Sequence, residues 1–272
     1  MLTPLVPRGR SLLCLLAALG AVGCFGGTES KSDERTEPEP RAFWPWLADY
    51  ESPGCTQPNV SCSSFVDARD GKTYRAVTVG AQTWMGTALN YGEFTAEPVS
   101  SSPEGGVFKR CPLGEPEWCD RAGALYTWHT MMALPEACEA EECLSFVRAP
   151  HQGICPDGWH VPTIEETTTL LDAVGTAIGP DCDTGAALKA TKGWVNVNGE
   201  DVNTDSSGLS VFPQTMAERA GTVWVTRTGI WTASIDARGA GLLSVSYGSD
   251  CALLDRYFAN TNRIESVRCV ED

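Results

Sequence analysis

The sequence predicts an α+β domain, because two helical segments lie among many short strand-like segments, with cysteines spread through both. Residues 73–79 (TYRAVTV) alternate β-branched and aromatic residues, which is typical of a strand. Residues 82–85 follow as its partner after a turn at Gly80. Further strands are expected at residues 222–226, 229–234, 241–247 and 265–270.

Two segments have the apolar spacing of helices. The first is expected over residues 123–134, where the stripe consists of Leu125, Trp128, Met131 and Met132. The second opens at Thr163, which forms a capping box with Glu166. Its buried face is expected to consist of Leu170, Leu171 and Val174.

The first 23 residues read as a signal peptide, with Arg8 and Arg10 before an apolar run too short to span a bilayer. The segment AVGC resembles a bacterial lipobox, which implies that Cys24 is acylated and anchors the protein to the membrane. An ordinary signal peptide cut at the same place is the alternative. In many Gram-negative bacteria, an Asp after the acylated cysteine retains a lipoprotein at the inner membrane. No Asp follows Cys24, so the resemblance implies the outer membrane. Residues 24–63 are expected to be an acidic tether.

The charge balance is strongly acidic, with 35 Asp and Glu against 20 Lys and Arg and a net charge of −15. Nucleic-acid binding needs a cationic surface that replaces phosphate counterions, so this class is excluded. Adsorption onto anionic lipid is disfavoured for the same reason.

Cysteine usage points to an exported, disulfide-bonded protein. Of the 12 cysteines, Cys14 leaves with the signal peptide and Cys24 is the lipid site, so an even number remains. Local spacing suggests the pairs Cys55–Cys62, Cys111–Cys119 and Cys138–Cys143. Zinc is the alternative, but the chain has no CxxC and only three histidines.

Four segments in order resemble the Fibrobacter succinogenes major paralogous domain family. They are FVDARDGKTYRAVTVGAQTWMGTALNY from residue 65, GALYTWHTMM from residue 123, GICPDGWHVPTIEE from residue 153 and ESVRCVED from residue 265. The resemblance covers residues 64–272. It implies that Cys155 and Cys269 occupy fixed core positions and pair, which leaves Cys182 for Cys251.

A second resemblance concerns the fold. The segment GWHVPTIEE is similar to a region of sulfatase-modifying-factor proteins, and residues 230–234 (IWTAS) resemble the late core strand of their C-type lectin-like fold. This implies two helices with short twisted antiparallel sheets. It carries no activity with it.

Two residues are candidates for catalysis. His160 could act as a base with Glu165 or Glu166, although Glu166 is also the expected helix cap. Late cysteines of formylglycine-generating relatives perform copper-dependent oxidation, which would point to Cys269. We expect a disulfide there instead, and therefore no catalytic residue.

Candidate ligand sites come from oxygen-rich and aromatic residues. Calcium ligands are suggested in the loop WVNVNGEDVNTD by Asn196, Asn198, Asp201 and Asp205. A solvated loop is the alternative. Trp118 and Trp194 could stack on a sugar, although a buried Trp is the default.

The sequence therefore favours a non-catalytic cell-surface module that binds a glycan, a protein or another envelope component. It shows no nucleophile elbow, no metal-ligand spacing and no phosphate loop. An oxidative or hydrolytic enzyme and a structural envelope protein are the alternatives. Apart from calcium, no cofactor is expected.

Overall fold

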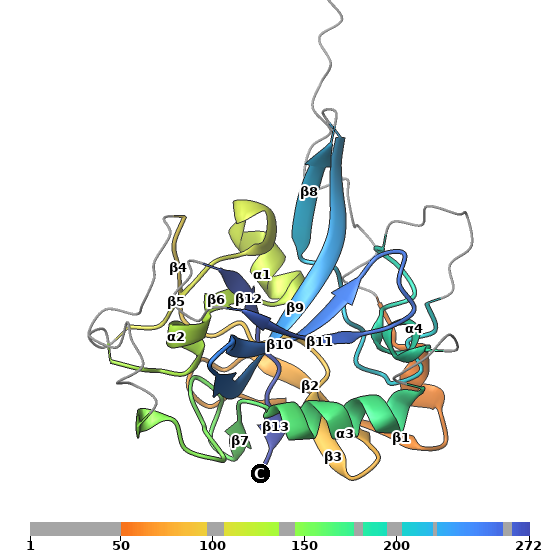
Figure 1. The fold of residues 1–272 in the computed structure, drawn as a ribbon, viewed down its shortest axis with the longest axis horizontal. Helices are drawn as coiled ribbons and strands as arrows, with labels where there is room; N and C mark the ends of the chain where they lie inside the picture. Colours follow the sequence, from red (N-terminus) through yellow and green to blue (C-terminus); the bar gives the residue numbers. More distant parts are fainter. Residues whose placement is uncertain are drawn as a thin grey trace, which may run out of the picture. The chain divides into compact units, whose positions relative to one another are not determined.

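Figure 1 shows the fold in a computed structural model, which describes residues 50–96, 106–135, 145–176, 182–194, 203–219, 222–257 and 263–272. The signal peptide and Cys24 lie outside the described residues. So do Cys138, Cys143, Asn196, Asn198 and Asp201.

Part of the predicted tether is folded. The 3-10 helix η3 (Pro53–Thr56) and strand β1 (Val60–Val66) both begin before residue 64. They are held by the Cys55–Cys62 disulfide and by a hydrogen bond from Ser52 Oγ to Asp205 Oδ2 of 2.7 Å. The domain therefore begins earlier than the acidic composition suggested.

The first sheet has the order β1-β2-β3-β13-β7. Its strands β2 (Thr73–Val79) and β3 (Gln82–Met85) have the predicted bounds and pair antiparallel across Gly80, whose φ is +60°. β13 (Val270–Glu271) lies between β3 and β7 (Trp159–His160). The last strand of the chain thus completes the sheet that the first strands begin.

The second sheet has the order β11-β10-β9-β12-β6, and β8 pairs with β9. Its strands are β6 (Leu125–Thr127), β8 (Thr215–Arg219), β9 (Thr222–Asp236), β10 (Gly239–Ser246), β11 (Leu253–Tyr257) and β12 (Ile264–Ser266). Two short strands, β4 (Glu93–Phe94) and β5 (Phe108–Lys109), pair separately. The segments predicted at residues 222–226 and 229–234 are one continuous strand, β9.

The helices of the described residues are short, except for α3. They are α1 (Pro116–Ala122), α2 (Trp128–Met131), α3 (Ile164–Val174) and α4 (Thr184–Leu188), with a second 3-10 turn η4 (Pro112–Gly114). The predicted capping box of α3 is present in full, with Thr163 and Glu166 bonded in both directions. Leu170 and Leu171 are buried beneath α3, as expected.

The predicted helix over residues 123–134 is wrong in its first half. Leu125, Tyr126 and Thr127 form β6, which pairs with β12, and only α2 is helical. Every residue from 122 to 132 is buried, so the apolar spacing reflects burial on all sides and not one helical face. The predicted strand over residues 265–270 likewise divides into β12 and β13, because residues 267–269 lead from one sheet to the other.

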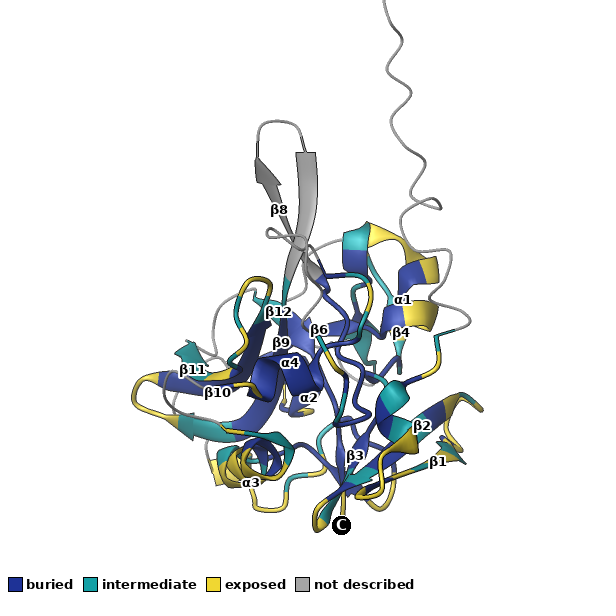
Figure 2. Ribbon diagram, turned by 90° about the vertical axis from the view of Figure 1, so that its right-hand side faces the viewer, coloured by how far each residue is buried: buried dark blue, intermediate teal, exposed yellow. Residues whose placement is uncertain are grey.

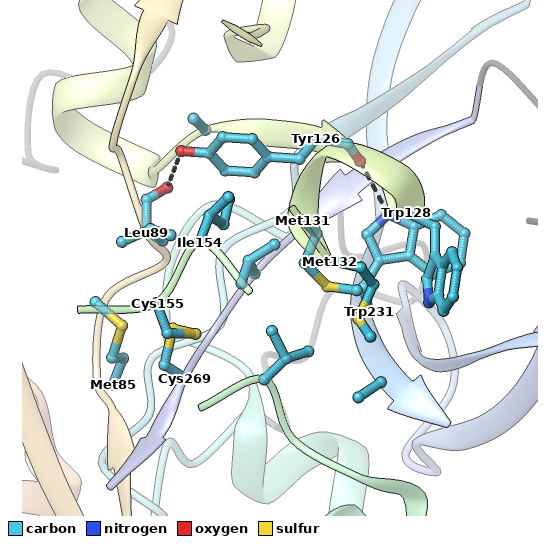
Figure 3. Packing of buried hydrophobic residues seen from close by; sticks show 14 of the residues in the cluster. Met85, Leu89, Tyr126, Trp128, Met131, Met132, Ile154, Cys155, Trp231 and Cys269 are labelled. Atoms are coloured by element: carbon cyan, nitrogen blue, oxygen red, sulfur yellow. Dashed lines mark hydrogen bonds between the residues drawn. A yellow bond between two sulfur atoms is a disulfide. The ribbon is translucent and has the colours of Figure 1, made fainter. Parts of the chain in front are cut away.

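The largest core cluster joins the two sheets (Figure 3). Trp231 of β9 donates from Nε1 to the carbonyl of Tyr126 at 2.9 Å. The Cys155–Cys269 disulfide lies in the same cluster, with both residues fully buried. A second cluster lies beneath α3, whose outer side is exposed in Figure 2, whereas α2 and α4 are buried. These contacts are consistent with the predicted α+β class.

Four of the five predicted disulfides are present in the described residues. They are Cys55–Cys62, Cys111–Cys119, Cys155–Cys269 and Cys182–Cys251. Cys138 and Cys143, the fifth predicted pair, lie outside them.

Candidate functional site

A polar pocket of about 240 Å³ lies between the start of β2, the chain after β3 and the end of α1. Seven of its ten lining residues are polar or charged. The lining residues are Lys72, Thr73, Tyr74, Thr87, Ala88, Asn90, Cys119, Asp120, Arg121 and Gly123. Drug-sized ligands occupy pockets of roughly 300–1,000 Å³, so this pocket suits a smaller and more polar molecule.

Hydrogen bonds fix the floor of this pocket. The backbone amide of Asn90 donates to the Tyr74 hydroxyl at 3.0 Å, and its side-chain Nδ2 donates to Asp120 Oδ1 at 2.9 Å. Behind Asn90, Lys109 Nζ donates to the Asn90 side-chain oxygen at 2.7 Å. Asn90 therefore orients Asp120 at the pocket surface from a buried position.

Gly123 allows the end of α1 to approach the chain after β3 closely. Its φ is +84°, and an added Cβ would lie 2.4 Å from the Ala88 Cβ. Only glycine fits such a contact with this backbone conformation. The Cys111–Cys119 disulfide also ties α1 to the chain before it. The pocket is therefore part of the scaffold and does not depend on a free loop.

Two side-chain groups at the pocket have unused hydrogen-bonding capacity within the described structure. Thr87 Oγ1 is buried and has no partner among the described residues. Asp120 Oδ1 accepts from Asn90, whereas no described residue donates to its second oxygen. A buried polar atom without a partner costs about 1–3 kcal/mol.

The His160 site predicted as a possible catalytic pair is assembled differently. His160 Nε2 lies 2.7 Å from Glu166 Oε1, and Nδ1 lies 2.7 Å from Asp272 Oδ1. Ionised carboxylates only accept, so both ring nitrogens must donate and the ring is an imidazolium. Burial alone would lower the pKa of His160, but the hydrogen bonds to Glu166 and Asp272 outweigh it and raise this pKa. Neither nitrogen remains to act as a base.

We expect His160→Gln to weaken folding by about 1–2 kcal/mol near pH 6, because glutamine is uncharged and has one donor nitrogen where the imidazolium has two. The pKa of His160 is raised on folding, so its stabilisation is complete below about pH 6.5 and is lost as the pH rises through the higher folded value. Urea unfolding of both proteins between pH 6 and 9 measures this. A stability gap that widens toward pH 9 would contradict the imidazolium assignment.

The predicted aromatic platforms lie inside the protein. Trp118 is 2 % exposed and packs with Ala122, Ala190 and Phe212, whereas Trp194 is 7 % exposed and donates to the Val211 carbonyl. Neither ring offers an open face for stacking, so we do not include either residue in the site.

The predicted calcium loop receives no support from its described member. Asp205 is fully buried and accepts from Tyr50, Ser52 and Ser210. Burial raises the pKa of Asp205, although the hydrogen bonds from Ser210 and Ser52 oppose this. Asn196, Asn198 and Asp201 lie outside the described residues, within which no group of three or more metal-ligating side chains occurs.

The pocket residues were not singled out by sequence reasoning. Lys72 and Asn90 lie within one family-like segment, but Asp120 and Arg121 belong to α1, which no periodicity indicated. The close approach of Gly123 to Ala88 and the hydrogen bond from Asn90 to Asp120 bring the segments together. A glycine opening the family-like segment GALYTW was the one available signal.

Comparison with known proteins gives one match. The family model described as the Fibrobacter succinogenes major domain matches residues 77–271. No curated protein and no solved structure matches the chain. Within the described residues, no helix is both long and apolar enough to cross a membrane.

Proposed function

This chain belongs to the Fibrobacter succinogenes major domain family, and on that basis we propose that it is a cell-envelope binding module that holds one sugar residue of a glycan in the pocket beside α1. The observation that carries the proposal is the braced polar pocket. Hydroxyl, amide and carboxylate groups converge there from three segments. Such groups pair with the many hydroxyls of a sugar.

The proposed location at the cell envelope rests on sequence features that remain predictions. The leader over residues 1–23 would direct export, and Cys24 would anchor the protein to the outer membrane, with the chain up to Tyr50 as a tether. The four disulfides support the export proposal, because such bonds persist in oxidising compartments. A membrane-anchored domain would meet surface glycans or neighbouring cells.

The C-type lectin-like architecture is part of the same proposal. Residues 230–234, which resemble the late core strand of that fold, lie in β9 at the centre of the second sheet. α3 follows the segment similar to the sulfatase-modifying-factor proteins. These features support the fold analogy, which by itself assigns no ligand.

Binding is favoured over the two enzyme hypotheses by particular contacts. Cys269, the residue that an oxidative enzyme would use, is disulfide-bonded and fully buried. Both nitrogens of His160 are bonded to carboxylates. The pocket beside α1 therefore remains the best-supported site, and binding its best-supported use.

A glycan array on the mature chain tests this function, with Thr73→Trp as the pocket-blocking variant. Thr73 is exposed at the pocket rim, and a strand position accepts tryptophan. We expect at least a tenfold loss of glycan binding. Thr168→Trp, on the exposed side of α3, is the matched control and should bind as wild type does. Equal binding by Thr73→Trp, or no glycan bound by wild type, contradicts the proposal.

A further inference from the structure

Basic side chains gather at the pocket beside α1, although the protein is acidic. The chain has a net charge of −15. Lys72 and Arg121 line the pocket, and Lys109 lies directly behind Asn90. Against these three cations stand Asp120 in the lining and Asp70, which pairs with Lys72 at 2.8 Å. Basic side chains that line a pocket on a strongly negative protein can attract an anionic group of a ligand.

Lys109 differs from Lys72 and Arg121 because it is buried. It is 8 % exposed, and its Nζ donates to the backbone and side-chain oxygens of Asn90 at 3.2 and 2.7 Å. No ion pair of the described residues includes it. A buried ammonium without a carboxylate partner is costly. Burial lowers the pKa of Lys109 and the nearby charge of Lys72 lowers it further, whereas the charges of Asp120 and Asp70 raise it. An anion in the pocket would act in the same direction as these two carboxylates.

The remaining groups divide the pocket into two parts. Lys72 and Arg121 supply positive charge, and a guanidinium pairs well with a carboxylate. Asp120 and Asn90 supply acceptors and donors suited to hydroxyls. A ligand that satisfies both parts carries a carboxylate and several hydroxyls on one small ring.

We infer that the pocket recognises a hexuronic acid residue, with its carboxylate toward Lys72 and Arg121 and its hydroxyls toward Asp120 and Asn90. This inference rests on the proposed glycan-binding function and adds the charge of the sugar to it.

Titration calorimetry with matched pairs tests the inference. Glucuronate is compared with glucose, and galacturonate with galactose, because each pair differs at one carboxylate. At least one uronate should bind the mature chain tenfold or more tightly than its neutral partner, and more weakly at 0.5 M than at about 0.05 M salt. Arg121→Gln and Lys72→Gln should remove most of this preference. Arg238→Gln, on an exposed ion pair far along the chain, should retain it.

The outcomes separate the inference from the function on which it rests. Equal binding of acid and neutral sugars, or binding of a neutral glycan alone, overturns the inference and leaves the glycan-binding function standing. Acetate that binds as tightly as the uronate also overturns it, because the pocket would then recognise a bare carboxylate. No binding of any glycan overturns both.

Discussion

Replacing both Cys155 and Cys269 with alanine is expected to lower the free energy of unfolding by about 5 kcal/mol, the largest effect that we expect from any disulfide here. The two cysteines are 114 residues apart, so their bond closes the longest loop among the described disulfides. A cross-link restricts the unfolded chain more strongly as the loop lengthens. Both sulfurs also lie in the core between the sheets, and their loss removes packing in the same direction.

Urea unfolding under non-reducing conditions measures this effect against a matched pair. Cys55 and Cys62 are only 7 residues apart, and their double alanine variant should lose about 2 kcal/mol. Similar losses in the two variants would show that loop length does not determine the stabilisation. A free, reactive thiol pair in the folded wild type would contradict the disulfide itself and revive the oxidative hypothesis.

Local sequence signals predicted local structure well in this chain. The alternation of residues 73–79 predicted β2, and the TIEE segment predicted the capping box of α3. Both features are decided by neighbouring residues. Cysteine spacing predicted Cys55–Cys62 and Cys111–Cys119 for the same reason.

Features that depend on tertiary surroundings were missed or misread. Leu125 joins a strand because β12 lies beside it, and no local periodicity reports this. The pocket joins Lys72 and Asn90 of one family-like segment to Asp120 of α1, so no spacing along the chain indicates it. Asp205 stands in an oxygen-rich stretch typical of calcium loops, yet its carboxylate is turned inward and meets the hydroxyls of Tyr50 and Ser52.

Arg268 is the second residue whose loss should have a large effect. Arg268 is 3 % exposed, and its guanidinium donates to the carbonyls of Met85 at 3.1 Å and Leu209 at 2.7 Å. It thereby ties the end of β3 to the loop that contains Asp205. Burial lowers the pKa of Arg268 to about 9, with a further contribution from Arg75, so the group stays charged at neutral pH.

The charge of Arg268 is compensated within the same buried group. Arg75 donates to the Ser210 hydroxyl at 2.8 Å, and that hydroxyl donates to Asp205 Oδ2 at 2.6 Å. Asp205 thus offsets two buried arginines, which explains why an acidic residue is fully buried in this loop. Removing one member leaves the others without compensation.

Arg268→Met is therefore expected to lose about 3–5 kcal/mol, because the carbonyls of Met85 and Leu209 stay buried without a donor and Asp205 loses one of its two counter-charges. Arg268→Lys should fall between this variant and wild type, since an ammonium cannot reproduce the planar fork. Arg238→Met is the control and should leave the urea midpoint unchanged, as its guanidinium is 75 % exposed. If Arg268→Met unfolded at the wild-type midpoint, apolar packing alone would hold the loop of Asp205, and the buried charges would contribute nothing to stability.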